Sequence, residues 1–129
     1  MREILFRGKR LEIGRFAIEN VCEWTYGGYA KDCSGVHIYN SMTSRRMVRV
    51  KPDTVCQYTG LTDKNDVKIF EGDIVDAPDR NFKGLPAEVR FMPDASFCVN
   101  RVGYPPIHLK AAKRFLEVVG NIYDNPELL

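Results

Sequence analysis

Apolar and polar side chains alternate over short stretches of the chain, and turn-forming residues separate these stretches. The alternation is clear in residues 36–39, where Val36 and Ile38 occupy one set of positions. His37 and Tyr39 occupy the other set. A repeat of two residues is typical of a strand with one buried face. We therefore expect Val36 and Ile38 inside, with His37 facing solvent or packed at the rim.

Residues 47–51 repeat this alternation, and the favoured register turns Val48 and Val50 inward. Further strands are predicted over residues 3–8, 24–30, 54–60, 68–76, 86–92, 95–100 and 115–123. Segment 68–76 is expected to form a strand, a turn and a second strand, and residues 86–92 and 95–100 can pair as a hairpin. Residues 107–114 can form a short helix, and residues 125–129 can form a last turn. Short strands divided by Gly and Pro favour a small barrel or roll over βαβ units.

Two polar segments are expected to shape turns. Residues 62–66 are rich in side chains that bend the backbone through their own hydrogen bonds. Glu71 and Asp73 flank Gly72, and two nearby carboxylates could serve acid–base chemistry. No nucleophile or metal-ligand set accompanies them, so we favour a structural interpretation. In this interpretation Gly72 permits a tight turn and the carboxylates accept hydrogen bonds from backbone amides.

Composition and length point to one globular domain. The chain has 129 residues, of which 44% are hydrophobic and 28% charged, which is enough for a core without metals or disulfides. No stretch approaches the length of a membrane helix, and the first residues lack the apolar region of a signal peptide. We therefore expect no membrane partner and a cytoplasmic location.

The net charge of +2 conceals two halves of opposite sign. Residues 1–51 hold ten basic and five acidic groups, whereas residues 52–129 hold nine basic and twelve acidic groups. These opposite charges could simply be solvated, or the two halves could attract each other within one chain or between chains. The basic excess of residues 1–51 could also mark an interaction face, for which the candidate residues are a basic cluster with aromatic neighbours: Arg45, Arg46, Arg49, Lys51, Trp24 and Tyr26.

The cysteines and histidines predict no catalytic or metal site. Cys22, Cys33, Cys56 and Cys98 form no CxxC or CxH pair, so the local chelate of a zinc site is missing. We interpret them as free, mostly buried thiols. The two histidines lie in no recognisable nucleophile motif. The sequence thus predicts no catalytic residues, no metal, no cofactor and no enzymatic activity.

Three ordered motifs and two shorter segments resemble one family. The motifs are Gln-Tyr-Thr-Gly-Leu-Thr-Asp-Lys-Asn at 57–65, Ile-Phe-Glu-Gly-Asp-Ile-Val at 69–75, and Leu-Glu-Val-Val-Gly-Asn-Ile-Tyr-Asp-Asn-Pro-Glu-Leu-Leu at 116–129. Residues 4–8 and 24–28 also match. Together they resemble the YopX family, small proteins of bacteriophages and of prophages. Asp66 and Cys56 stand where the family often has glycine, so Asn65 or Asp66 must take any left-handed position in that turn.

The resemblance implies a mainly β fold with minor α structure. Residues 52–129 would form an SH3-like small barrel and residues 1–51 would add strands, all within a single domain 1–129. It also implies a phage or prophage accessory protein in a bacterial host, but no particular activity. We expect a non-enzymatic module that binds another macromolecule. A protein partner or self-association, as in a homo-oligomer, is the first expectation, and nucleic acid is the alternative.

Overall fold

The computed structural model describes residues 3–13, 18–39, 47–78 and 84–129. The chain forms two compact units, Met1–Gln57 and Tyr58–Leu129, which we call unit 1 and unit 2 and describe separately. Both are built mainly from antiparallel strands, as the alternation of the sequence predicts. The expected fold class, mainly β with minor helix, is therefore confirmed.

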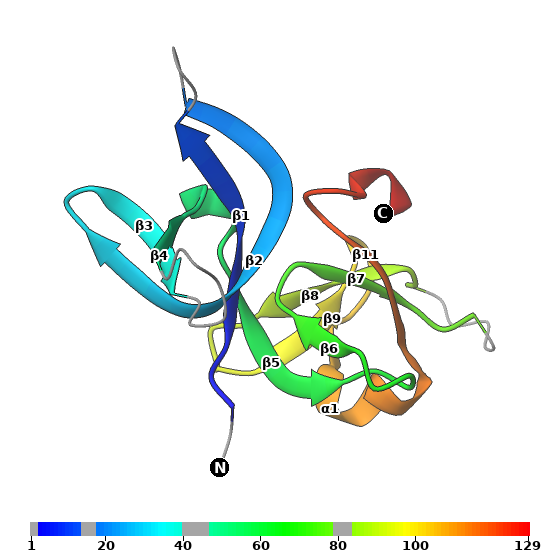
Figure 1. Cartoon of the computed structure of the whole chain (residues 1–129). Helices are drawn as coiled ribbons and strands as arrows, with labels where there is room; N and C mark the ends of the chain where they lie inside the picture. Colours follow the sequence, from blue (N-terminus) through cyan, green and yellow to red (C-terminus); the bar gives the residue numbers. More distant parts are fainter. Residues whose placement is uncertain (1–2, 14–17, 40–46, 79–83) are drawn as a thin grey trace. The chain divides into compact units, whose positions relative to one another are not determined.

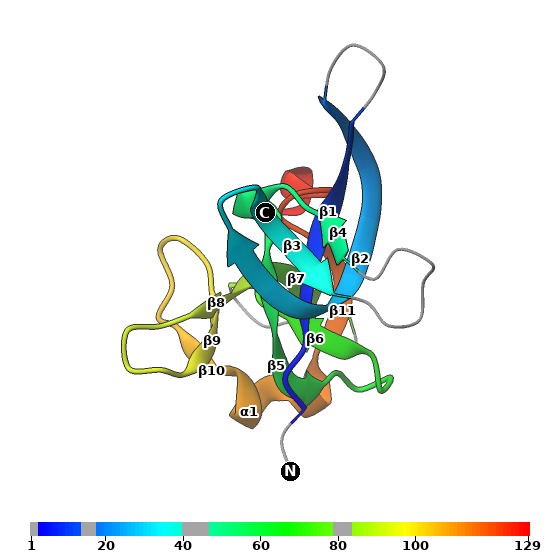
Figure 2. The same cartoon turned by 60° about the vertical axis from the view of Figure 1, so that its left-hand side comes forward.

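Unit 1 is an antiparallel sheet whose central strand is unusually long. Its elements are β1 (Phe6–Ile13), β2 (Ile18–Asp32), β3 (Gly35–Tyr39), β4 (Met47–Arg49), the 3-10 turn η1 (Pro52–Thr54) and the start of β5 (Cys56–Thr62). The strand order is β4-β3-β2-β1-β5. The first part of β2 pairs with β1 and its last five residues pair with β3, and the strand curves between the two ladders (Figures 1 and 2).

The core of unit 1 lies on one face of this sheet. Val36, Ile38 and Val50 are buried, and Phe6 and Val55 pack against them. The predicted inward positions in residues 36–39 are therefore confirmed. The neighbouring positions in β3 are partly or fully exposed, as the two-residue repeat requires.

Unit 2 contains the second sheet and the helical segments. After the rest of β5 come β6 (Lys68–Phe70), β7 (Asp73–Asp76), β8 (Ala87–Phe91), β9 (Phe97–Asn100), β10 (Ile107–His108), α1 (Leu109–Ala112), the 3-10 turn η2 (Lys113–Phe115), β11 (Glu117–Asn121) and the 3-10 turn η3 (Pro126–Leu128). β5 pairs with β6, and the second sheet has the order β10-β9-β8-β7-β11. The predicted 86–92/95–100 hairpin is present as β8 and β9, and the predicted short helix as α1 with η2.

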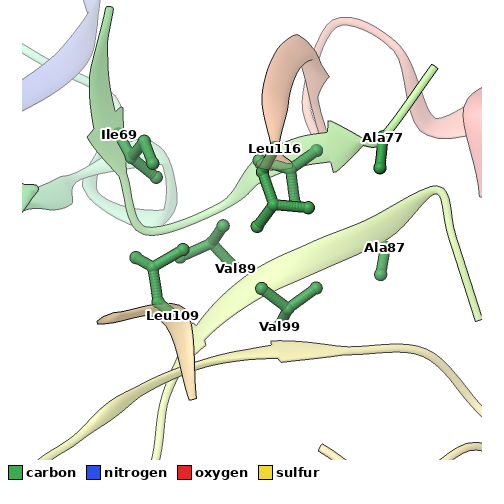
Figure 3. Close-up of a cluster of buried hydrophobic side chains, with 8 residues drawn as sticks. Ile69, Ala77, Ala87, Val89, Val99, Leu109 and Leu116 are labelled. Atoms are coloured by element: carbon green, nitrogen blue, oxygen red, sulfur yellow. The ribbon is translucent and has the colours of Figure 1, made fainter. Parts of the chain in front are cut away.

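One cluster of buried aliphatic side chains forms the core of unit 2. Its members are Ile69, Val75, Ala77, Ala87, Val89, Val99, Leu109 and Leu116. Figure 3 shows Leu109 and Leu116 directed toward Val89 and Val99 of the sheet. The short helical segment is thus held by the leucines that bracket it, because a four-residue helix has little stability of its own.

The SH3-like small barrel expected for residues 52–129 is not confirmed, because the strands do not form a closed barrel. The strands form two antiparallel sheets, and within the described part of unit 2 the outer strands β10 and β11 do not pair with each other. A closed barrel needs a continuous ladder between its first and last strands. β10 is only two residues long and leads directly into α1, so it cannot supply that ladder.

The turn between β5 and β6 is organised by the buried carboxylate of Asp63. Its Oδ1 accepts hydrogen bonds from the backbone N–H groups of Asn65 and Val67, at 2.8 and 3.0 Å. Its Oδ2 accepts one from Val118 in β11, at 2.9 Å. Asp66 takes the left-handed conformation, with φ of 64°, which confirms the expectation for this turn. One side chain thus shapes the turn and attaches it to a strand 55 residues away.

Gly72 and Asp73 have the structural roles that the sequence favoured for them. Gly72 adopts φ of 85°, a conformation that favours glycine, between β6 and β7. The Oδ2 atom of Asp73 accepts a hydrogen bond from the Phe70 N–H at 2.8 Å, and the Asp73 side chain is buried. The carboxylate therefore holds the turn by accepting a hydrogen bond from a backbone amide.

We predict that Asp63→Asn lowers the free energy of unfolding by about 2–3 kcal/mol, because hydrogen bonds to a buried charge are lost and an amide NH₂ faces a backbone donor. Urea denaturation measures this change. Asp66→Asn is the matched control: Asp66 is exposed, and Asn accepts its left-handed backbone, so its effect should stay within about 0.5 kcal/mol. Equal effects of the two variants would contradict the role given to Asp63.

Candidate binding site

The register of the β1–β2 ladder places cationic side chains opposite aromatic ones. Arg7 pairs with Tyr26, and Lys9 pairs with Trp24. Residues two apart in a strand share a face, and so do directly paired residues in neighbouring strands. All four side chains therefore belong to the face of the unit 1 sheet opposite its core, which we call the outer face.

The cations of β1 lie close to the indole ring of Trp24. The Arg7 guanidinium carbon is 4.6 Å from the ring centroid, and the Lys9 Nζ is 5.6 Å from it. Both distances are within the range of cation–π attraction. Arg7 is only 6% exposed, so the cation that contacts the Trp24 ring most closely is buried, whereas Lys9 is partly exposed.

Backbone hydrogen bonds fix the position of Lys9. Its N–H donates to the Thr54 Oγ1 at 2.9 Å, and its carbonyl oxygen accepts from the Lys51 N–H at 2.9 Å. The Thr54 hydroxyl also donates to the Lys51 carbonyl oxygen at 2.6 Å. The turn η1 thus holds β1 in place beside the aromatic side chains of β2.

The outer face continues across β3 and β4. Gly28 of β2 pairs with Tyr39, which pairs with Met47. In the next row, His37 pairs with Arg49. The row with Gly28 therefore carries two large side chains that face away from the core.

Several large side chains of this face are open to solvent. Tyr26, Tyr39 and Met47 are 44%, 43% and 46% exposed. Arg49 lies across Gly35, where a Cβ atom would come within 3.2 Å of its Nε, so the guanidinium rests on the strand at a position without a side chain. The outer face thus combines exposed aromatic rings with the partly exposed cations Lys9 and Arg49.

An ionisable pair lies at the end of this face. The His37 Nδ1 is 4.0 Å from the Asp32 Oδ1. The Ser34 hydroxyl, at 2.5 Å, and the Ser34 N–H, at 2.8 Å, donate to the same carboxylate oxygen and lower the pKa of Asp32, and the nearby His37 adds to this shift. The Asp32 carboxylate is thus kept ionised beside His37, whose side chain is only 14% exposed.

The residues predicted for binding fall into three groups. Trp24, Tyr26 and Arg49 lie on the outer face, on strands β2 and β4. Lys51 is exposed after β4, with its Nζ 4.0 Å from the Asp53 carboxylate. Arg45 and Arg46 lie outside the described residues.

Sequence reasoning did not place Arg7 and Lys9 beside the aromatic residues. The available signal was their two-residue spacing, which matches the spacing of Trp24 and Tyr26. Spacing alone does not reveal which strands pair or in what register, because the ladder contains a shift between Lys9 and Leu11.

The described residues contain no group of three or more His, Cys, Asp or Glu side chains placed to hold a metal ion. Cys33, Cys56 and Cys98 carry free thiols. Cys56 and Cys98 are buried, and Cys33 is exposed. No helix in the described ranges is long and apolar enough to cross a membrane.

The fold and the outer face define a mainly β protein of two antiparallel sheets, one of which carries cations and aromatic side chains opposite its core. The model of one protein family, described as YopX protein, matches residues 14–129. The chain therefore belongs to the YopX family. A search of curated proteins found no match.

Adjacent glycines of β2 allow a direct test of how the outer face is built. A Cβ atom on Gly27 would lie 1.8 Å from the Tyr39 carbonyl oxygen, whereas one on Gly28 would meet only the Tyr39 Cβ, at 4.0 Å. We predict that Gly27→Ala lowers the free energy of unfolding by about 2–3 kcal/mol through this backbone clash. Gly28→Ala should change it by less than about 1 kcal/mol. Urea denaturation compares the two variants, and equal effects would contradict the β2–β3 geometry.

Proposed function

We propose that this protein is a non-enzymatic binding module, of phage or prophage origin and acting in the host cytoplasm, that binds another macromolecule through the outer face of unit 1. The β1–β2 register carries the proposal, because it brings Lys9 beside Trp24 and puts Tyr26 on the same face. The phage origin and the cytoplasmic location extend the family membership and the sequence arguments given above.

The exposed rings of the outer face are not needed for the core. Val36, Ile38 and Val50 form the core on the opposite side of the sheet. Tyr26 and Tyr39 nevertheless keep more than two fifths of their surface in water. Exposed aromatic side chains next to cations favour a recognition role, because tyrosine and arginine are enriched where proteins bind partners.

Single-stranded nucleic acid is the partner that this chemistry supports best. Aromatic side chains stack on bases of any sequence, and neighbouring cations meet the phosphates. The partly exposed Lys9 and Arg49 lie on the same sheet face as Tyr26 and Tyr39. The excess of basic groups in residues 1–51 adds a favourable long-range field.

The proposal contains no catalytic step. His37 lies beside Asp32 at the end of the outer face, and His108 belongs to β10 in unit 2. The Asp73 carboxylate is buried and accepts a hydrogen bond from the Phe70 amide. The Asp32–His37 pair thus lies at the edge of the binding face, and the Asp73 carboxylate has a structural role.

Titration with a short oligothymidine at low salt tests the proposal, with the fluorescence of Trp24 as the signal. Trp24 is the single tryptophan of the chain and lies on the outer face, so stacking nearby should change its emission. We predict that Tyr26→Ala and Tyr39→Ala each weaken binding by about 1–3 kcal/mol through lost stacking. Lys9→Gln should weaken binding and reduce the slope of log K against log salt by about 0.7.

Lys110→Gln is the matched control, because it removes the same charge from an exposed position in unit 2. Its affinity for the oligonucleotide should equal that of the wild type. Undetectable binding at low salt, or binding that the three outer-face variants leave unchanged, would overturn the assignment to nucleic acid.

A further inference from the structure

An apolar hollow opens on the surface of unit 2, and none of its lining residues belongs to the outer face. Its volume is about 190 Å³. Val99 and Leu116 line it and also belong to the core cluster, so the hollow reaches the edge of the core. Ile107 and Ala111 also line it and are exposed, which places them at its mouth. Leu85, Ala112 and Phe115 complete an entirely hydrophobic lining.

The size of the hollow limits what it can hold. An apolar cavity of about 150 Å³ accepts a ligand the size of benzene. Sites for drug-sized ligands are larger, at roughly 300–1,000 Å³. This hollow, at about 190 Å³, therefore fits one aromatic side chain and is too small for a cofactor or a long acyl chain.

The chain segment that lines the hollow carries three cations, Lys110, Lys113 and Arg114. The Arg114 guanidinium carbon is 4.7 Å from the ring centroid of Phe115, which lines the hollow. Lys110 and Lys113 are sequence neighbours of the lining residues Ala111 and Ala112. Within the described part of the chain, no carboxylate lies in ion-pair distance of these three cations. Residues 109–116 thus carry three basic and no acidic side chains, although residues 52–129 as a whole are acidic.

We propose that this hollow binds a phenylalanine side chain within an acidic segment of a partner protein. The ring would fill the apolar space, and carboxylates beside it would meet Lys110, Lys113 and Arg114. An apolar anchor with a charged surround is a common way to recognise a peptide, because the anchor supplies affinity and the charges supply selectivity. This site is independent of the outer face of unit 1 and of the function proposed for it.

A labelled peptide with one central phenylalanine between glutamates is a suitable probe, with fluorescence anisotropy as the measurement. The full-length protein should bind this peptide, and replacing its phenylalanine with alanine should weaken binding about tenfold. The protein variant Ala111→Trp, which narrows the mouth at an exposed position, should weaken binding to a similar extent. The double variant Lys110→Glu, Arg114→Glu should weaken it about fivefold or more and reduce its dependence on salt.

Lys31→Glu provides the charge control, because Lys31 is exposed in unit 1 and its reversal should leave peptide affinity unchanged. Urea denaturation of each variant checks that it is folded. Should Ala111→Trp fail to fold, amide chemical shifts of the wild type with peptide provide the second test, with changes expected at Ala111, Ala112 and Phe115.

Three results would overturn the proposal: no binding of the phenylalanine peptide at low salt, equal binding of the alanine peptide, or undiminished binding by a folded Ala111→Trp. The last variant should still bind oligothymidine like the wild type. The peptide assay therefore tests the proposal for the hollow separately from the oligothymidine assay, which tests the proposal for the outer face.

Discussion

The antiparallel ladder between β1 and β2 is the interaction on which the outer face depends. It sets Lys9 opposite Trp24 and Arg7 opposite Tyr26, and a shift of one residue would exchange the two faces of the strand. Trp24 lies over the buried Arg7, while the hydroxyl of Thr54 holds the backbone of Lys9. Because β2 continues past β1 to pair with β3, the same alternation extends to Tyr39 and Arg49. One register thus separates an aliphatic core from a cationic and aromatic surface.

In unit 2, two buried carboxylates accept hydrogen bonds from backbone N–H groups and so stabilise the turns between strands. Asp63 accepts hydrogen bonds from its own turn and from Val118, and Asp73 accepts one from Phe70. A backbone N–H that is buried on folding loses its hydrogen bond to water, and the carboxylate supplies the acceptor that replaces it. The open sheet is then completed by Leu109 and Leu116, which bring the short helical segment against the core. The proposed peptide site follows from this arrangement, since the hollow lies where that segment meets the sheet edge at Ile107.

Much of the fold was predictable because its determinants are local. The repeat of Val36 and Ile38, the glycine at position 72 and the left-handed turn at Asp66 depend on neighbours in the chain. The SH3-like barrel expected from the family resemblance is not confirmed, because barrel closure depends on whether distant edge strands meet, and β10 is too short to form a ladder with β11. For the outer face, Trp24, Tyr26 and Arg49 were identified from their types, but their cationic neighbours Arg7 and Lys9 were not, since strand register is a non-local property.

The sequence by itself determined the strand-rich class, the main turns, the opposite charges of the two halves and, through its motifs, membership of the YopX family. These properties follow from side-chain alternation, backbone preferences and composition, which act within a few residues of each other. Only the tertiary structure decided which cations lie beside Trp24, that the sheets stay open, and that Ala111 and Phe115 border an apolar hollow. These features arise from strand pairing and side-chain packing between segments far apart in the chain, and neither composition nor local pattern predicts which distant segments meet.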